Sequence, residues 1–239
     1  MTHPDTSPHP PLRARSRARK PNERSNGSRV QPLASSRDRT PTFDDKLLRL
    51  LHAAARVFAD VGYDRASMRR IAAEAELSLA GIYHYVASKE ELLYWIQLHT
   101  FDSLLQGLES SLEGEADPTR RLAAGVRNHI RHFGANMQEL RVCARELEAL
   151  EGEAYAAVHE RRRAYFEAVH GLVIGLHPDR AADRGSWLAT ANLFGMLNWF
   201  YQWYDAERSR VGLDELAAQQ TALFLDGYIA SGGTSGEEA

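Results

Sequence analysis

Residues 67–91, SMRRIAAEAELSLAGIYHYVASKEE, decide how the rest of this chain is interpreted. The spacing of the apolar residues predicts a helix, a tight turn, a short helix and the start of a third helix. A serine stands at each expected helix start. Ser67 and Ser78 can each accept a hydrogen bond from an otherwise unpaired amide, and Ser88 with Glu91 forms a capping box. The stretch therefore predicts a compact unit of short, well-capped helices.

The second of these helices is too short to be stable alone, because isolated helices below roughly 12–15 residues are marginal in water. Leu79, Ile82 and Val86 are expected to lean on its neighbours. The face that remains directed outward or sideways is small at its start and aromatic at its end, and consists of Ala80, Gly81, Tyr83, His84 and Tyr85. Small residues allow close approach to a DNA major groove, and the polar tips can reach base edges.

Three basic residues flank this face. Arg69 and Arg70 lie on the helix before it, and Lys89 lies at the start of the helix after it. These positions suit contacts with DNA phosphates, and Lys89 would act together with the free amides of a helix N-terminus.

Residues 49–91 resemble the DNA-binding domain of the TetR family of bacterial transcriptional regulators. The matching pieces are the helix end at Phe58, Gly62 and Tyr63, the helix at 67–75, the recognition helix with Ser78, Ile82, Tyr83, His84 and Tyr85, and residues 88–90. The resemblance implies a homodimer on a DNA operator, with a small-molecule effector. The DNA-binding residues that we expect are Ser67, Arg69, Arg70, Ser78, Leu79, Ala80, Gly81, Tyr83, His84, Tyr85 and Lys89.

Three positions depart from the family pattern. Glu76 stands where a turn glycine is usual, and a left-handed conformation costs a non-glycine residue roughly 1–2 kcal/mol. This substitution predicts a tighter turn or a longer first helix. Leu79 replaces a frequent lysine or arginine, which predicts one phosphate or base contact fewer, and Ala87 replaces a frequent proline or glycine.

The composition fits a globular protein of the cytoplasm. The chain has 239 residues, of which 44% are hydrophobic, so a real core is available. Its single cysteine, Cys143, rules out an internal disulfide, suits a reducing cytosol and is expected to be buried. No apolar run approaches the ~20 residues that span a bilayer, and no secretory signal is present. We therefore expect a bacterial cytoplasmic location and no membrane partner.

The basic residues are concentrated in the first 43 residues, although the whole chain has a net charge of −3. This segment is rich in Pro, Ser, Arg and Asn, and it is expected to be a disordered tail because it offers little apolar surface. Its run RARSRARK at 13–20 either follows DNA phosphates or remains a solvated tail, since such a run is only electrostatic. Residues 232–239 are expected to form a second disordered tail.

The chain between the tails predicts an all-α fold of about nine helices. A helix-turn-helix domain is expected at 44–92, on a first helix whose face carries Leu47, Leu51, Ala54, Phe58 and Val61 and which stops at Gly62. A ligand-binding and dimerisation domain is expected at 93–231. Its helices are predicted at 88–112, 119–134, 136–150, 151–176, 181–208 and 213–230. No period-two pattern indicates a strand.

The last two of these helices are the expected dimer surface. A pair of recognition helices reads two half-sites roughly 34–36 Å apart, and Gly195 with the aromatic residues around it suits close helix packing. Some aromatics are instead expected to line an apolar ligand cavity with a few polar groups. The ligand-binding residues that we expect are Trp95, His99, Phe101, Arg145, Phe194, Asn198, Trp199, Gln202 and Trp203.

The C-terminal segment 192–228 is similar to that of TetR-type regulators of fatty-acid, sterol and aryl-acid breakdown. This similarity implies an acyl-CoA thioester as effector, with no cofactor. Arg141, Arg145 or the run at 161–163 is placed to meet CoA phosphates. The alternative for these arginines is pairing with nearby glutamates such as Glu146, Glu148 and Glu167. We expect a repressor that the effector releases from DNA.

Two other classes of protein were weighed against this interpretation. An enzyme is disfavoured because the chain has no Gly-rich phosphate loop and no nucleophile elbow. His129 and His132 could seat two metal ligands, but such a bare pair is more often found on the surface, so no metal site is expected. A helical adaptor that binds proteins would explain the tail and the amphipathic helices, but not the outward Tyr83, His84 and Tyr85.

Overall fold

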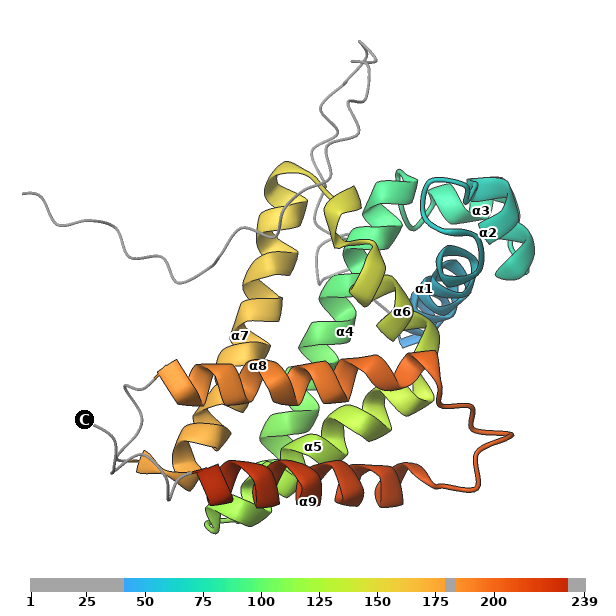
Figure 1. The fold of residues 1–239 in the computed structure, drawn as a ribbon. Coiled ribbons are helices and arrows are strands. Elements are labelled where there is room, and N and C mark those ends of the chain that lie inside the picture. Colours follow the sequence, from blue (N-terminus) through green and yellow to red (C-terminus); the bar gives the residue numbers. More distant parts are fainter. Residues whose placement is uncertain (1–40, 179–183, 232–239) are drawn as a thin grey trace, which may run out of the picture. The chain divides into compact units, whose positions relative to one another are not determined.

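The computed structural model describes residues 41–178 and 184–231, and all of its secondary structure over these ranges is helical (Figure 1). The predicted all-α class is confirmed. The α-helices are α1 (Pro41–Val61), α2 (Met68–Glu74), α3 (Leu79–Tyr83), α4 (Lys89–Leu112), α5 (Pro118–Ala135), α6 (Met137–Arg145), α7 (Gly152–Leu176), α8 (Arg184–Trp199) and α9 (Leu213–Ser231). Short 3₁₀ turns, η1 (Leu147–Ala149) and η3 (Phe200–Gln202), follow α6 and α8. The tail predicted at 1–43 is three residues too long, because residues 41–43 belong to α1. The rest of that tail, 1–40, and the tail predicted at 232–239 lie outside the described residues.

The first three helices form the helix-turn-helix unit. α1 buries Leu50, Leu51 and Phe58 against α2 and α4, and it ends where Gly62 takes a φ of +80°. The three predicted caps are present: the hydroxyl of Ser67 accepts from Arg70 N, that of Ser78 from Gly81 N, and that of Ser88 from Glu91 N. The return bond of the capping box runs from Ala87 N to Glu91 Oε2 over 2.6 Å, one residue before the expected amide.

The turn between α2 and α3 corrects our prediction for Glu76. The turn is neither tighter nor preceded by a longer helix, because Glu76 itself takes the left-handed conformation, with a φ of 55°. Two hydrogen bonds close the turn, from Glu76 N to Ala73 O over 3.2 Å and from Leu77 N to Ala72 O over 3.0 Å. This pair of bonds is the Schellman arrangement, which terminates a helix with a residue that is usually glycine.

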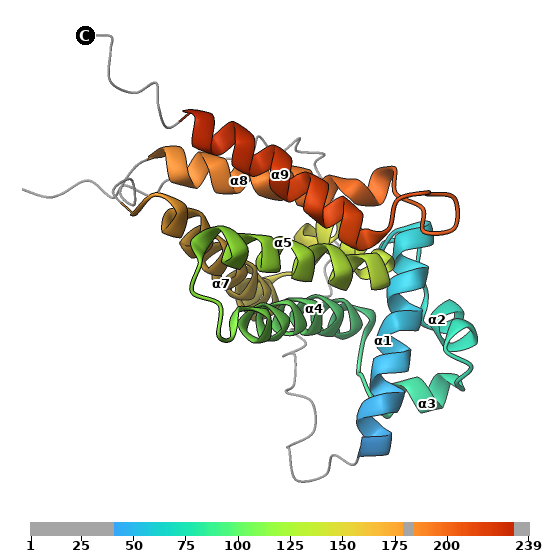
Figure 2. The same ribbon diagram turned by 90° about the horizontal axis from the view of Figure 1, so that it is seen from below.

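The remaining helices pack around one hydrophobic core. α5 lies between α4 and α9, and α7 packs on α4, α5 and α8 (Figures 1 and 2). Leu104, Leu122, Ile130, Val173 and Leu193 are fully buried at the centre of this core. α6 lies against α1, so it connects this core to the helix-turn-helix unit.

The aromatic segment that follows residue 184 is less regular than predicted. Instead of one helix to residue 208, α8 ends at Trp199 and η3 follows. The chain turns here because Phe200, Tyr201 and Tyr204 return to the core and are buried. No helix of the described residues is long and apolar enough to cross a bilayer.

Candidate DNA-recognition surface and effector domain

The short helix α3 is fastened from one side and exposed on the other. Ile82 is fully buried and Val86 is buried, so they hold the helix against the unit. Tyr83 is 52% exposed, and Ala80 and His84 are also exposed. Leu79 corrects our prediction that it leans inward, because it too is exposed. This adds an apolar side chain to the outward face, at the helix end that would approach a groove.

Ion pairs to α1 hold α2 in place. Arg56 Nε lies 2.6 Å from Glu74 Oε1, and the Arg70 guanidinium pairs with Asp60. Arg69, the neighbour of Arg70, is exposed. Of the two predicted phosphate contacts on α2, Arg69 therefore lies on the surface, whereas Arg70 would have to exchange its carboxylate partner for a phosphate.

Lys89 has a structural role that the sequence did not reveal. Its ammonium group donates to the carbonyl oxygens of Tyr63 (2.7 Å), Ala66 (3.2 Å) and Asp64 (3.4 Å). It also lies 4.2 Å from the centre of the Tyr63 ring, a cation–π distance. The start of α4 is thereby tied to the loop that carries α2. Its predicted phosphate contact is untested, and it would compete with these bonds.

Two polar contacts join the helix-turn-helix unit to α6. His52 Nδ1 lies 2.6 Å from Glu139 Oε1, and Tyr63 N donates to Glu146 Oε1 over 3.3 Å. The pKa of His52 is raised, mainly by this hydrogen bond to Glu139. Burial raises the pKa of Tyr63 to about 12. α6 and the residue that follows it are therefore in direct polar contact with the middle of α1 and with the loop after α1.

A buried polar pair lies inside the C-terminal core. His129 Nδ1 is hydrogen-bonded to the Tyr165 hydroxyl over 3.1 Å, and both side chains are fully buried. Burial lowers the pKa of His129 to about 3 and raises that of Tyr165, so both are neutral near pH 7. Phe133 and Phe194 contact the imidazole ring edge-on. His129 Nε2 has no hydrogen bond of good geometry, and its polar neighbours are Asn198 and the backbone of Leu197.

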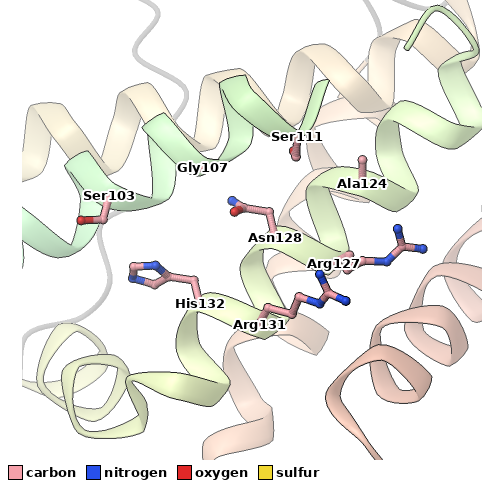
Figure 3. A pocket seen from close by; sticks show the side chains of 8 residues that line it. All are labelled: Ser103, Gly107, Ser111, Ala124, Arg127, Asn128, Arg131 and His132. Carbon is pink, nitrogen blue, oxygen red and sulfur yellow. The ribbon is translucent and has the colours of Figure 1, made fainter. Parts of the chain in front are cut away.

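Two grooves open on this domain. The first, of about 570 Å³, lies between α4 and α5 (Figure 3). Its lining is polar and consists of Ser103, Gly107, Ser111, Ala124, Arg127, Asn128, Arg131 and His132. The second, of about 510 Å³, lies between α4, α5 and α7. It is mainly apolar and is lined by Leu105, Leu108, Glu109, Leu112, Ala116, Pro118, Arg121, Ala168, Gly171, Leu172 and Gly175.

Comparison with known proteins places both parts of the chain in one family. Residues 50–94 match the model of bacterial regulatory proteins of the tetR family, and residues 115–228 match the tetracyclin repressor-like C-terminal domain. A TetR-family transcriptional regulator from Bordetella parapertussis has a crystal structure that is 33% identical, with a TM-score of 0.71. The similarity covers 77% of this chain and 96% of that one. The chain belongs to the TetR family of transcriptional regulators.

Two further relatives of this TetR-family chain are informative. AibR, solved in complex with isovaleryl coenzyme A and operator DNA, is 25% identical over 74% of this chain and 97% of its own, with a TM-score of 0.63. The transcriptional activator FasR of Mycolicibacterium smegmatis is 30% identical over 58% of this chain. The matched region spans 64% of FasR, which is less than two thirds of its length.

None of the nine predicted ligand-binding residues of this TetR-family domain lines either of the two grooves described above. Phe101 is buried and Phe194 is half-buried against the core, next to Tyr165. Asn198 is near His129, and Trp95 donates to Glu91 over 3.3 Å. The remaining five are exposed: His99, Arg145, Trp199, Gln202 and Trp203. Their role in ligand binding stays a prediction.

Large apolar side chains are exposed on α8, on α9 and just after η3. Trp199 is 61% and Trp203 57% exposed, and Leu188 and Leu223 have 54% and 67% of their surface exposed. A Cβ added at Gly195 would meet no atom within 4 Å. Exposed large apolar side chains in one region mark an interaction surface. We call Leu188, Trp199, Trp203 and Leu223 the α8–α9 face.

The arginines considered for CoA phosphates are largely paired. Arg161 lies 3.1 Å from Asp102, and Arg163 contacts Glu160 and Glu167, as the alternative of glutamate pairing predicted. Arg162 differs from its two neighbours in the run at 161–163. It is half-buried and donates to Cys143 O over 2.7 Å. Burial raises the pKa of the Cys143 thiol to about 12, which fits the expected buried cysteine.

His129 also corrects a prediction, because it is buried rather than on the surface. A signal for this was present in the sequence. Leu122, Val126, His129 and Phe133 follow one another at spacings of four, three and four residues, which is the pattern of a buried helical face. Within the described ranges, no group of three or more His, Cys, Asp and Glu side chains is arranged to hold a metal ion.

Proposed function

We propose that this TetR-family regulator is a homodimeric repressor that binds a two-fold DNA operator and is released by an acyl-CoA effector. The observation that carries the DNA part is the exposed, aromatic outer face at the end of α3, on the side away from the buried Ile82 and Val86. The residues that we propose at the DNA are Ser67, Arg69, Arg70, Ser78, Leu79, Ala80, Gly81, Tyr83, His84, Tyr85 and Lys89. Lys89 and Arg70 would first leave their partners within the chain.

The α8–α9 face supports the dimer. When a partner covers exposed tryptophan and leucine side chains, the complex is stabilised by roughly 25 cal/mol per Å² of buried apolar surface. Trp199 and Trp203, which we predicted at the ligand, fit this role better because more than half of their surface is exposed. Two copies joined by this face would present two recognition helices to two half-sites.

The apolar groove between α4, α5 and α7 suits the acyl chain. Its floor includes Leu108 and Leu172, which belong to the same core cluster as Phe101. Phe194 packs against this cluster, and contact of Phe101 and Phe194 with the acyl chain stays a prediction. AibR, a relative with isovaleryl coenzyme A in its crystal structure, supports this class of effector.

Two routes link such a ligand to the DNA-binding unit. α4 runs without a break from the groove to Lys89, which holds the α1–α2 loop. α6 reaches the same unit through His52–Glu139 and Tyr63–Glu146. A shift of either helix would change the separation of the recognition helices. The coupling free energy should lie in the typical range of about 1–3 kcal/mol.

A footprint on the DNA upstream of the protein's own gene tests the DNA part. A protected site with two-fold symmetry is expected, whereas an adaptor that binds proteins would give none. Fluorescence polarisation with the protected site then tests the effector. Long-chain acyl-CoA should weaken binding roughly 5- to 150-fold, and the free fatty acid is the control. If saturating acyl-CoA leaves operator affinity unchanged, the effector assignment is wrong and the DNA assignment stands.

A further inference from the structure

The polar groove between α4 and α5 has a distinctive lining. One face of α4 contributes only small residues, Ser103, Gly107 and Ser111, which recur every four residues (Figure 3). α5 contributes Asn128 and His132 on the side toward α4, and the long cationic side chains of Arg127 and Arg131, one turn apart, extend along the other edge of the groove (Figure 3). The volume of about 570 Å³ lies within the range of small-molecule sites. The small residues let α4 and α5 pack closely at Gly107, and the groove opens beside this contact.

The charge of this groove is positive in a part of the chain that is otherwise acidic. None of its eight lining residues is a carboxylate. The nearest acid that contacts the lining is Asp214 of α9, which pairs with Arg131 through two contacts of 2.6 Å. Arg127 is exposed on the same face of α5. Guanidinium groups match phosphate oxygens in geometry and bind them through charge-assisted hydrogen bonds.

Neutral polar groups complete the lining. His132 is half-buried, and burial lowers its pKa, so its neutral ring offers one donor and one acceptor. Asn128 donates to Leu104 O over 3.2 Å, which fixes its side chain where α4 and α5 approach most closely. A Cβ at Gly107 would lie 2.5 Å from Asn128 Oδ1, so this close approach requires glycine. The groove is therefore a rigid polar recess with two cations at its edge.

We propose that the groove between α4 and α5 binds the phosphate groups of a nucleotide-type ligand, with Arg127 and Arg131 as the phosphate contacts. This inference rests on the proposed function for its ligand class, a CoA thioester, and it places the phosphates in a groove that shares no lining residue with the apolar groove proposed for the acyl chain. It assigns those phosphates to α5 rather than to the arginines at 141, 145 and 161–163. Ligand bound there lies against α4, the helix that begins in the DNA-binding unit.

Isothermal titration of the full-length protein with coenzyme A and with adenosine 3′,5′-bisphosphate tests the site. Both should bind, whereas inorganic phosphate should bind far more weakly. Because one charge-assisted hydrogen bond contributes a factor of roughly 10 to 100 in affinity, Arg127→Gln and Arg131→Gln should each weaken bisphosphate binding by about this factor. If neither compound binds the wild-type protein, the proposal is wrong.

Two further variants separate phosphate binding from structural effects. Asp214→Asn removes the carboxylate that occupies Arg131, so it should strengthen bisphosphate binding, by up to about fivefold for an exposed pair. If the Arg131–Asp214 pair had only a structural role, Arg131→Gln and Asp214→Asn would both weaken bisphosphate binding. Arg208→Gln is the matched control, because this exposed arginine also pairs with an aspartate, Asp205, but away from the groove. Arg208→Gln should bind the bisphosphate with the same affinity as the wild type.

The operator assay then distinguishes this inference from the proposed function. If acyl-CoA releases the wild-type protein and the double variant Arg127→Gln/Arg131→Gln at the same concentration, the groove inference is wrong while the effector assignment stands. If the bisphosphate binds and the arginine variants lose it, but acyl-CoA leaves operator affinity unchanged, the groove is a phosphate site and the effector assignment fails.

Discussion

Replacing Glu76 with glycine should stabilise the protein. Glu76 has a φ of 55° in the turn between α2 and α3, where an L-residue with a Cβ pays roughly 1–2 kcal/mol. Glycine removes this strain but adds conformational entropy to the unfolded chain, which offsets about 0.4–1 kcal/mol. The mid-range values leave a net gain of about 0.8 kcal/mol, between limits of about 0 and 1.6 kcal/mol. The Glu76 side chain is exposed, so its loss should matter little.

Urea unfolding followed by circular dichroism measures this gain, at one fixed protein concentration because dimerisation would add to stability. With an m-value of about 2–3 kcal/mol per M, the midpoint should rise by roughly 0.3–0.4 M. Glu76→Ala is the matched control. It removes the same carboxylate but keeps the Cβ in the strained conformation, so its midpoint should stay near that of the wild type.

The opposite change at Gly62, which ends α1 with a φ of +80°, should cost stability. Gly62→Ala is expected to lower the free energy of unfolding by about 1 kcal/mol. The reasoning is refuted if Glu76→Gly unfolds at the midpoint of Glu76→Ala or below it, because the relief of backbone strain is expected to exceed the chain entropy that glycine adds. Glu76→Gly and Glu76→Ala should bind operator DNA equally well.

Other predictions concern DNA binding, the dimer and pH. The double variant Tyr83→Ala/His84→Ala should lose about 1–3 kcal/mol of operator affinity per lost base contact. Its urea midpoint should be unchanged, since both side chains are exposed. A gel-shift titration that gives the wild-type affinity would contradict this prediction. Leu223→Glu should give a monomer in analytical ultracentrifugation, because it places a charge in the α8–α9 face; a persisting dimer would show another interface. The raised pKa of His52 beside Glu139 stabilises the fold below about pH 6.5, and this contribution is lost as the pH rises through the folded-state pKa. The stability difference between the wild type and His52→Gln should therefore be larger at about pH 6 than at about pH 8, and a difference that grows with pH would refute this assignment.

Local signals in the sequence were enough to predict the helix-turn-helix unit. Ser67, Ser78 and Ser88 each cap a helix where predicted, because the capping bond depends only on residues within one turn. The stop at Gly62 is equally local. Ile82, an apolar residue of α3, is buried as its spacing predicts.

Contacts between distant parts of the chain could not be read from the same patterns. Lys89 looked free to meet a phosphate, yet it binds carbonyl groups more than twenty residues earlier in the chain. Arg162 belongs to a run of three arginines, and only its position on α7 relative to α6 turns it inward, toward Cys143. A side chain with several possible partners takes the one that the tertiary fold brings close, and one-dimensional spacing does not specify that choice.

The single thiol of this protein offers a direct view of motion in α6. Cys143 is buried beneath Arg162 in the helix that contacts α1, and it is the chain's only cysteine. A buried, protonated thiol reacts with disulfide reagents only when its surroundings open. The rate at which such a reagent modifies the native protein therefore reports how often α6 detaches. Measured with and without a bound metabolite, or with and without DNA, this rate would show whether that helix loosens during signalling, without any engineered label.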